Sequence, residues 1–257
     1  RSRVNLSQNG DGLDTPGDCP KSAAAMRATL DHLGHGQLTG KLTINSPIPR
    51  SKGMGSSSAD VTATIAATAL ALGTELTPET MAAIALSVEP SDGVMFPGIA
   101  LLDHREGSII QVLGTPPPME IVALDWGGTV DTVEFNTVDR RFQWKSIQDE
   151  VDEALKLVRT GIREQDPSLI GQGASISSRA SQAVLFKPQL PEVMEFAENV
   201  GAVGVNIGHS GTIIGILLDA RERTGKSVYH KANQAFPNAE AINHFRLLSG
   251  GIRRVAS

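Results

Sequence analysis

Cysteine, aromatic residues and positive charge are all scarce in this sequence. Cys19 is the single cysteine, and aromatic residues make up 4% of the chain. One cysteine cannot form an internal disulfide, nor a zinc site by itself, so a reducing compartment such as the cytoplasm is favoured. Lys and Arg number 23 against 28 Asp and Glu, a formal net charge of −5. This balance argues against a general nucleic-acid binder, which usually carries a basic face.

Long apolar runs are missing as well. No stretch approaches the length of about 20 residues that a membrane span requires, and no secretory signal is visible. The 257 residues suit one large domain or two small ones, which can fold without cross-links. Prolines at 116–118 break the chain, so the expected domains are residues 1–116 and 117–257.

Hydrophobic periodicity predicts both helices and strands in each half. In the first half we expect strands at 3–6 and 42–44, helices at 21–34, 57–72 and 78–88, and a β-hairpin at 99–112. In the second half we expect, in order, strand 120–125, helices 146–161, 168–183 and 192–200, strands 203–207 and 212–218, helix 225–235 and strand 245–248. This order lacks a regular alternation of strand and helix, which predicts an α+β fold, not a doubly wound sheet.

The segment 49–58, PRSKGMGSSS, joins a glycine-rich loop to the start of an apolar helix. Gly53 and Gly55 let the backbone approach an anion closely, and the free N–H groups of a helix start attract negative charge. The three serine hydroxyls can bond phosphate or complete a Mg²⁺ shell. A serine-capped helix after a flexible loop is the plainer alternative, but such a cap requires neither three serines nor two spaced glycines. The pattern is neither the Walker A loop nor the dinucleotide fingerprint.

Two carboxylates, Glu89 and Asp92, follow the predicted helix 78–88. Pro90 ends that helix, so both side chains can point out of the turn. Phosphoryl transfer uses carboxylates to hold Mg²⁺ and to orient or deprotonate an attacking hydroxyl. The alternative is a solvated helix end. Acidic groups are mildly unfavourable at a helix C-terminus, so the sequence accepts a small cost here.

A glycine-rich turn, Gly-His-Ser-Gly at 208–211, separates two apolar strands in the second half. Its glycines permit a tight loop, and its polar side chains could bond a ligand. The residues alone leave a ligand-binding turn and a plain β-turn equally open. Candidates to pair with a substrate carboxylate are Arg50, Arg105, Arg179 and Lys187, with none favoured over the others.

The pattern Pro-x-x-x-Gly-x-Gly-Ser-Ser-Ser resembles the signature loop of the GHMP kinases, the superfamily of galactokinase, homoserine kinase and mevalonate kinase. Lys52 and Met54 in the loop, Glu-Pro-Ser-Asp at 89–92 and His-Ser-Gly at 209–211 are similar to one branch, the L-threonine kinases of the cobalamin pathway. The likeness runs from about residue 42 to residue 252. It implies a two-domain α+β fold, with an N-terminal α/β domain carrying the phosphate-binding loop and a C-terminal ferredoxin-like domain. ATP and substrate are then expected in a cleft between the two domains.

The resemblance also implies an activity and roles for residues. The expected reaction is transfer of the ATP γ-phosphate to the hydroxyl of L-threonine, with Mg²⁺ as metal cofactor. The expected nucleotide-binding residues are Pro49, Lys52, Gly53, Met54, Gly55, Ser56, Ser57 and Ser58. Ser57 and Glu89 are expected to bind Mg²⁺, and Asp92 to orient or deprotonate the hydroxyl. The expected substrate-binding residues are His209, Ser210 and Gly211.

Other readings stay open. The chain could be another kinase of the superfamily acting on homoserine, mevalonate or pantoate, an inactive nucleotide-binding regulatory protein, or an acidic interaction domain. Whether two copies form a homodimer is not decided by the sequence. The superfamily also carries an N-terminal motif on its first hairpin, in the threonine-kinase branch a Pro-Gly-x-x-Gly-Glu-like segment, which is not found here. Because residues 3–6 read as the middle of a strand, we expect upstream sequence to be missing.

Overall fold

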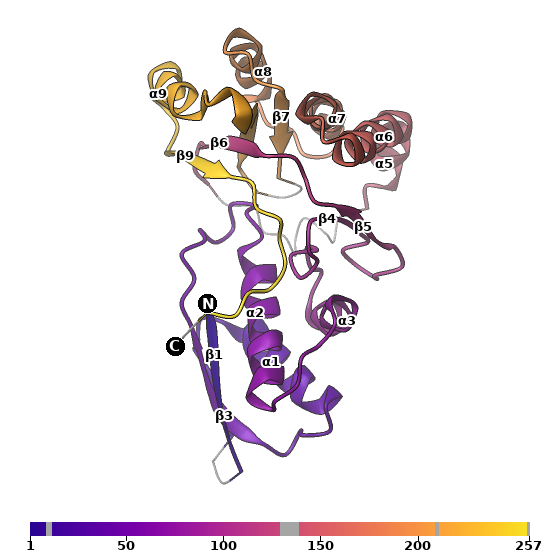
Figure 1. Cartoon of the computed structure of the whole chain (residues 1–257), viewed down its shortest axis with the longest axis vertical. Coiled ribbons are helices and arrows are strands. Elements are labelled where there is room, and N and C mark those ends of the chain that lie inside the picture. Colours follow the sequence, from indigo (N-terminus) through magenta and orange to yellow (C-terminus); the bar gives the residue numbers. More distant parts are fainter. Residues whose placement is uncertain (9–11, 129–138, 209–210, 256–257) are drawn as a thin grey trace. The chain divides into compact units, whose positions relative to one another are not determined.

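The computed structural model describes residues 1–8, 12–128, 139–208 and 211–255 (Figure 1). By its internal contacts the chain divides into two compact units. The first consists of Arg1–Ile48, Gly55–Gly114 and Ser249–Ser257, and the second of Pro49–Met54 and Thr115–Leu248. The chain therefore passes from the second unit back to the first inside the predicted phosphate-binding loop, after Met54.

In its described residues, the first unit consists of three helices, a small sheet and a hairpin. The helices are α1 (Pro20–His32), α2 (Ser56–Ala71) and α3 (Pro78–Val88). The sheet has the order β1-β3-β2, with β1 (Ser2–Ser7) antiparallel and β2 (Leu13–Asp14) parallel to β3 (Thr39–Ile44). The hairpin pairs β4 (Ile99–Leu102) with β5 (Ile110–Gly114). Val4 and Leu42 of the sheet pack on Met26 and Leu30 of α1, and all four side chains are buried.

Local sequence accounts for the start of α3. The Oγ1 of Thr77 accepts a hydrogen bond from the backbone N–H of Thr80 at 3.2 Å, and Pro78 occupies the first helical position. A threonine cap followed by proline is a common helix start, because the cap satisfies a free N–H and proline has none to satisfy. One face of the helix then buries Met81, Ala82, Ile84 and Ala85. The helix predicted at residues 78–88 is confirmed.

The second unit is an antiparallel sheet with helices. Its strands are β6 (Met119–Asp125), β7 (Gly204–Ile207), β8 (Ile214–Asp219) and β9 (Ala241–Arg246). The segments α5 (Arg141–Ser146), α6 (Gln148–Glu164), α7 (Pro167–Ala180), η1 (Ser181–Ala183) and α8 (Leu190–Asn199) lie between β6 and β7, and η2 (Ala220–Glu222) and α9 (Gly225–Ala235) between β8 and β9. The order across the sheet is β7-β8-β6-β9, and every neighbouring pair is antiparallel. This split β-α-β arrangement confirms the expected ferredoxin-like second half.

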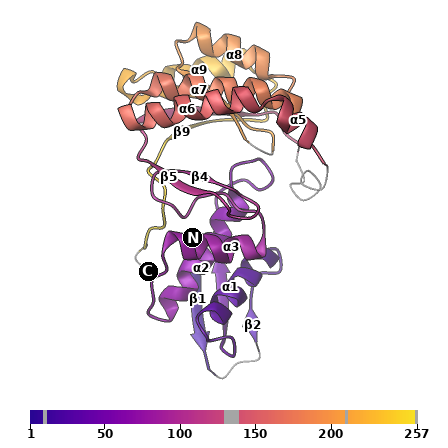
Figure 2. The same cartoon turned by 90° about the vertical axis from the view of Figure 1, so that its right-hand side faces the viewer.

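Helices α6 to α9 cover one face of this sheet (Figure 2). Alternate residues of the strands point to that face, as the period of two in a strand requires. The resulting core contains Val122 and Leu124 of β6 and Ile214 and Ile216 of β8, all fully buried. In the described part of the chain, no helix is both long and apolar enough to cross a bilayer.

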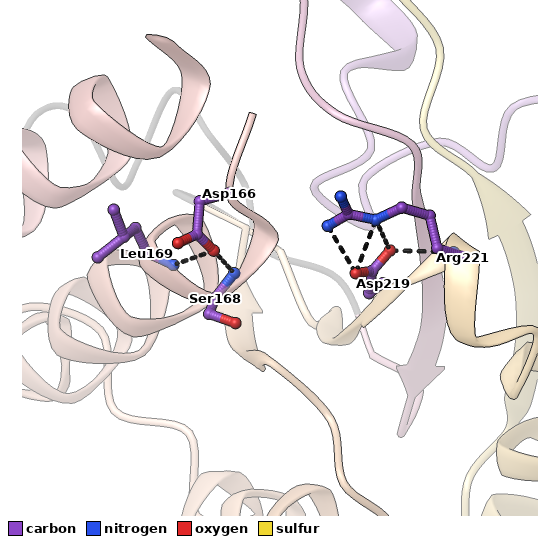
Figure 3. Close-up of polar contacts among 5 residues, drawn as sticks. All are labelled: Asp166, Ser168, Leu169, Asp219 and Arg221. Carbon is purple, nitrogen blue, oxygen red and sulfur yellow. Dashed lines mark hydrogen bonds and ion pairs between the residues drawn. The ribbon is translucent and has the colours of Figure 1, made fainter. Parts of the chain in front are cut away.

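Aspartates mark two ends of elements in the second unit (Figure 3). Oδ1 of Asp166 accepts hydrogen bonds from the backbone N–H groups of Ser168 and Leu169, and so caps α7. Asp219 ends β8, where it accepts from the backbone N–H of Arg221 at 2.9 Å and pairs with the guanidinium of the same residue at 2.7 Å.

The last strand differs from its expected position. Strand β9 lies at Ala241–Arg246, whereas the sequence favoured residues 245–248. It is an edge strand, and its polar residues His244 and Arg246 face Glu120 of β6 at 3.2 Å and 3.5 Å. An edge strand with polar side chains lacks the apolar alternation from which strands are predicted. The short elements β2 and α5 also lack a periodic apolar pattern, and the sequence did not predict them.

Candidate functional site

The start of α2 has the local geometry of an anion cradle. Gly55 precedes the helix in the left-handed region, at φ 66°, and Gly53 has φ 84°. No side chain caps α2 at Gly55, so its first N–H groups keep the partial positive charge of a helix N-terminus. Ser56 and Ser58 are buried on the first turn. Pro49 is exposed, and Met54 is half-buried.

Glu89 lies against this first turn. It follows α3 directly and has extended backbone angles. The hydroxyl of Ser57 donates a hydrogen bond to Oε1 of Glu89, and the ammonium of Lys21 forms an ion pair with Oε2. The Glu89 side chain is 9% exposed, whereas that of Lys21 is 46% exposed. A hydroxyl, a carboxylate and an ammonium group therefore meet at one point of the first unit.

Asp92 contacts the next serine of the same turn. Its backbone N–H donates to Oγ of Ser58 at 2.9 Å, and the Ser58 hydroxyl lies 3.3 Å from its Oδ2. A Cβ placed on Gly55 would lie only 3.1 Å from that Oδ2, so the carboxylate sits beside the loop backbone. The buried Ser91 holds the turn, since its N–H donates to the His104 carbonyl at 2.9 Å. The structure thus brings Glu89 and Asp92 together with Ser57 and Ser58.

Lys52 belongs to the second unit and lies in a separate charged cluster. Its Nζ is 2.8 Å from Oδ2 of Asp125, the last residue of β6, and 3.6 Å from Oε1 of Glu240. Thr212 donates from its hydroxyl to Oδ1 of Asp125 at 2.5 Å and from its backbone N–H to the Lys52 carbonyl at 3.2 Å. The N–H of Gly127 also donates to Oδ1 of Asp125, at 3.0 Å. Both ends of Lys52, its amine and its backbone, are therefore fixed.

Gly211 packs directly on the backbone of the loop. A Cβ at this position would lie 2.3 Å from the carbonyl carbon and oxygen of Lys52 and from the nitrogen of Gly53, and its φ is 90°. Lys187, which is 6% exposed, donates from its Nζ to the Gly211 carbonyl. His209 and Ser210, the other two predicted substrate-binding residues, lie outside the described residues.

Charge in this second cluster is set by opposing effects. Burial alone would raise the pKa of Asp125, but hydrogen bonds from Lys52, Thr212 and Gly127 outweigh it and lower that pKa. The hydrogen bond to Asp125 raises the pKa of Lys52. Burial lowers the pKa of Lys187, although the negative charge of Asp125 opposes this effect. Asp125 is therefore an ionised carboxylate beside two amines.

Sequence reasoning missed four of these residues as members of a cluster: Lys21, Asp125, Lys187 and Thr212. Lys21 stands in the first turn of α1, where a positive charge is unfavourable, and that local cost was a usable signal. Asp125 ends an apolar strand just before two glycines at 127–128, which is a common place for functional side chains. The sequence around Lys187 and Thr212 contains no comparable signal that would place them in the cluster.

Arg179, another candidate for a substrate carboxylate, lies elsewhere in the second unit. With Glu153 and Glu198 it lines a cavity of about 410 Å³ among α6, α7, α8 and β7. None of the predicted nucleotide-binding, metal-binding or catalytic residues lines this cavity.

Comparison with known proteins gives a consistent answer. Residues 21–97 match the family model "GHMP kinases N terminal domain", and residues 151–238 match "GHMP kinases C terminal". An L-threonine kinase of Salmonella typhimurium is 29% identical over 242 residues, 91% of this chain and 80% of that protein. An L-threonine kinase of Citrobacter freundii is 31% identical over 179 residues, 70% of this chain and 62% of that protein. A crystal structure of homoserine kinase from Cytophaga hutchinsonii has a TM-score of 0.72 at 18% identity, covering 96% and 84% of the two chains.

The two matched segments make up more than half of the chain, and they stand in the order that the resemblance predicts. The chain belongs to the GHMP kinase family. Together with the two kinase relatives, the family makes this protein a small-molecule kinase.

Proposed function

We propose that this kinase transfers the γ-phosphate of ATP to the side-chain hydroxyl of L-threonine, giving O-phospho-L-threonine. The observation that carries the proposal is the likeness to two L-threonine kinases, at 29% and 31% identity over 91% and 70% of the chain. Use of the product in cobalamin side-chain synthesis, in the cytoplasm, is part of the same proposal.

The glycine–serine loop is the proposed nucleotide site. The residues that bind ATP are Pro49, Lys52, Gly53, Met54, Gly55, Ser56, Ser57 and Ser58. Backbone N–H groups at the start of α2 hold phosphate oxygens, because they have no partner in the helix and carry the positive end of its dipole. Lys52, a residue of the same loop, contributes an ammonium group that is held by Asp125. The uncapped helix start supports this assignment.

Ser57 and Glu89 fit the requirements of Mg²⁺. They supply a hydroxyl and a carboxylate oxygen that already lie in contact. Mg²⁺ is typically held by one or two carboxylates, with water and substrate phosphates completing its shell. When bound, the ion neutralises charge on the β- and γ-phosphates. The ammonium of Lys21 supplies a second positive charge at Oε2 of Glu89.

Asp92 is the proposed hydroxyl-orienting group or base. Ser58 holds its backbone and one carboxylate oxygen, so the side chain keeps its position next to the loop. The threonine oxygen attacks the γ-phosphorus and the bond from that phosphorus to the β–γ bridging oxygen breaks, so ADP leaves. The hydroxyl proton passes to Asp92. Most of the rate enhancement comes from positioning and charge neutralisation.

The glycine-rich turn is the proposed substrate site, through His209, Ser210 and Gly211. Gly211 supports this role because it packs on the loop backbone at Lys52 and Gly53. The turn would present polar groups to the amino acid on one side and brace the loop on the other.

A substrate panel tests the proposal. Purified protein is incubated with Mg·ATP and, separately, L-threonine, L-homoserine, mevalonate or pantoate, and both ADP and the phosphorylated product are measured. We expect kcat/KM for L-threonine to exceed that for the others by at least about tenfold, roughly the effect of one well-placed polar contact. A preference for another alcohol would show that this alcohol, and not L-threonine, is the substrate. ATP binding without turnover of any alcohol would indicate a regulatory nucleotide-binding protein.

A further inference from the structure

We propose that Asp125 and Lys187 are positioning residues that hold the Pro49–Met54 segment of the loop in its nucleotide-binding shape. This inference rests on the proposed function of the loop. It assigns no chemistry to either side chain, because each acts through a neighbour: Asp125 through Lys52 and Thr212, and Lys187 through Gly211.

Asp125 holds the loop at two points. Its Oδ2 binds the amine of Lys52 at 2.8 Å, and its Oδ1 accepts from Thr212, whose backbone N–H donates to the Lys52 carbonyl. The Lys52 and Asp125 side chains are 15% and 8% exposed, so little water is available to weaken their ion pair. A buried aspartate at the end of β6 thus fixes both the side chain and the backbone of one loop residue.

Lys187 holds the turn that lies against the loop. Its buried ammonium donates to the carbonyl of Gly211, and the Gly211 backbone lies so close to Lys52 and Gly53 that a Cβ would overlap their atoms. A buried ammonium is costly unless it is hydrogen-bonded and near an opposite charge. The Gly211 carbonyl supplies the hydrogen bond, and Asp125 supplies the charge. An apolar side chain would fill this site without the free-energy cost of burying a charge. The presence of a lysine is therefore explained by its hydrogen bond to the Gly211 carbonyl.

The charges of the cluster are balanced. Lys52 pairs with Asp125 at 2.8 Å and lies 3.6 Å from Glu240, and the charge of Asp125 also acts on Lys187. These contacts fix the Lys52 side chain and the loop backbone together. Loss of these contacts should weaken nucleotide binding more than it slows the chemical step, because a loosened loop must be ordered again when ATP binds.

The test compares Asp125→Asn and Lys187→Met with a matched control, Asp219→Asn. Asp219 pairs with Arg221 at 2.7 Å (Figure 3). It lies at the opposite end of β8 from Thr212, so its substitution removes an aspartate ion pair of the same sheet away from the loop. We measure KM for ATP, kcat, and hydrogen exchange of the amides in Pro49–Met54 and in α8. For both test variants we expect KM for ATP to rise about tenfold, an effect typical of one lost charged contact, and kcat to fall less than about threefold. The loop amides should exchange about tenfold faster, while the exchange of the α8 amides stays unchanged. The control should move none of these values.

Two results would overturn the inference. The first is an unchanged KM for ATP and unchanged loop exchange in both test variants. The second is equally faster exchange in the loop and in α8, which would make the two residues merely structural. Should Asp125→Asn fail to fold, Thr212→Val replaces it, with Thr212→Ser as the conservative variant that restores the hydroxyl and the wild-type KM. Should Lys187→Met fail to fold, Lys187→Leu replaces it. Exchange is measured without substrate, so wild-type protein that does not phosphorylate L-threonine would refute the proposed function and leave the exchange result standing.

Discussion

The hydroxyl of Ser57, in the first turn of α2, donates a hydrogen bond to the carboxylate of Glu89, the residue that follows α3, across 32 positions of sequence. The contact joins the N-terminus of α2, the proposed phosphate-binding end, to an acidic residue at the end of another helix. It explains why a carboxylate is kept at a helix C-terminus, where the helix dipole disfavours it. The partner is the serine that the GHMP kinase pattern predicts for Mg²⁺.

Substitutions at Ser57 and Glu89 test whether the two side chains bind one Mg²⁺ ion. We expect Glu89→Gln and Ser57→Ala each to lower kcat about 100-fold, since each removes an oxygen that stabilises charge in the transition state. The double variant should be hardly worse than the stronger single one, because both oxygens serve one ion. The measurement is the rate as a function of free Mg²⁺. Ser87→Ala is the control, because its hydroxyl only donates back to Ile84 within α3. Additive losses would argue against a shared ion.

Asp92→Asn tests the role of that carboxylate. A general base contributes about 10² to 10⁴ in rate, so we expect kcat to fall within this range while KM for ATP changes little. Asparagine keeps the shape and the backbone N–H that bonds Ser58. A variant with kcat within about threefold of wild type would leave Asp92 outside proton transfer and only near the hydroxyl.

Lys21→Met tests the third group at Glu89. Its ammonium and a metal ion would compete for the same carboxylate, so we expect the Mg²⁺ concentration for half-maximal rate to fall about threefold, a modest effect for an ion pair with a half-exposed partner. Lys41→Met is the control, because it breaks the exposed ion pair with Asp14 on the sheet. This control should leave the Mg²⁺ concentration for half-maximal rate unchanged. A rise in the Mg²⁺ requirement would instead show that Lys21 helps to assemble the site.

Much of the fold follows from local sequence. The caps and breakers around Thr77 and Gly55, and the short apolar runs of β6 and β8, are signals within a few residues of the elements they define. Edge strand β9 lacked this signal, because its polar side chains His244 and Arg246 are matched by Glu120 on a neighbouring strand. Its position depends on pairing across the sheet, which periodicity does not report.

The site divides in the same way. Glu89 and Asp92 stand in a recognisable turn, so the sequence marked them as site candidates, with Ser57 expected beside Glu89. The contact of Ser58 with Asp92 is seen only in the structure. Asp125 and Thr212 are 87 positions apart, and neither belongs to a pattern that names the other. Their cluster arises from the order β7-β8-β6-β9, which places the end of β6 beside the start of β8. Such residues become visible only once the sheet is assembled.

The β4–β5 hairpin should respond to acid through Asp103. Its pKa is lowered to about 2, chiefly by the hydroxyl of Ser108, which donates to Oδ2 at 2.6 Å, and also by the backbone N–H of Arg105. Because this value lies below the unfolded value of about 3.9, the ionised form stabilises the fold above about pH 4, and the effect is lost as the pH falls towards 2. In thermal unfolding, Asp103→Asn should therefore have a lower Tm than wild type at pH 7, with a gap that narrows towards pH 3. A Tm difference that stays the same from pH 7 to pH 3 would exclude ionisation of Asp103 as the cause of the stabilisation.

Gly211→Ala should damage nucleotide binding by direct overlap. The new methyl group would lie 2.3 Å from three backbone atoms of Lys52 and Gly53, so the turn and the loop must separate. Gly201→Ala is the matched control, because Gly201 also has positive φ, at 71°, but open space around its Cβ position. The control should lose about 1 kcal/mol of stability, the cost of alanine in the left-handed region. Gly211→Ala should show at least a tenfold higher KM for ATP as well, roughly one lost contact in the loop. Equal effects of the two substitutions, by thermal unfolding and ATP titration, would mean that backbone strain alone explains both and that the contact with the loop does not matter for binding.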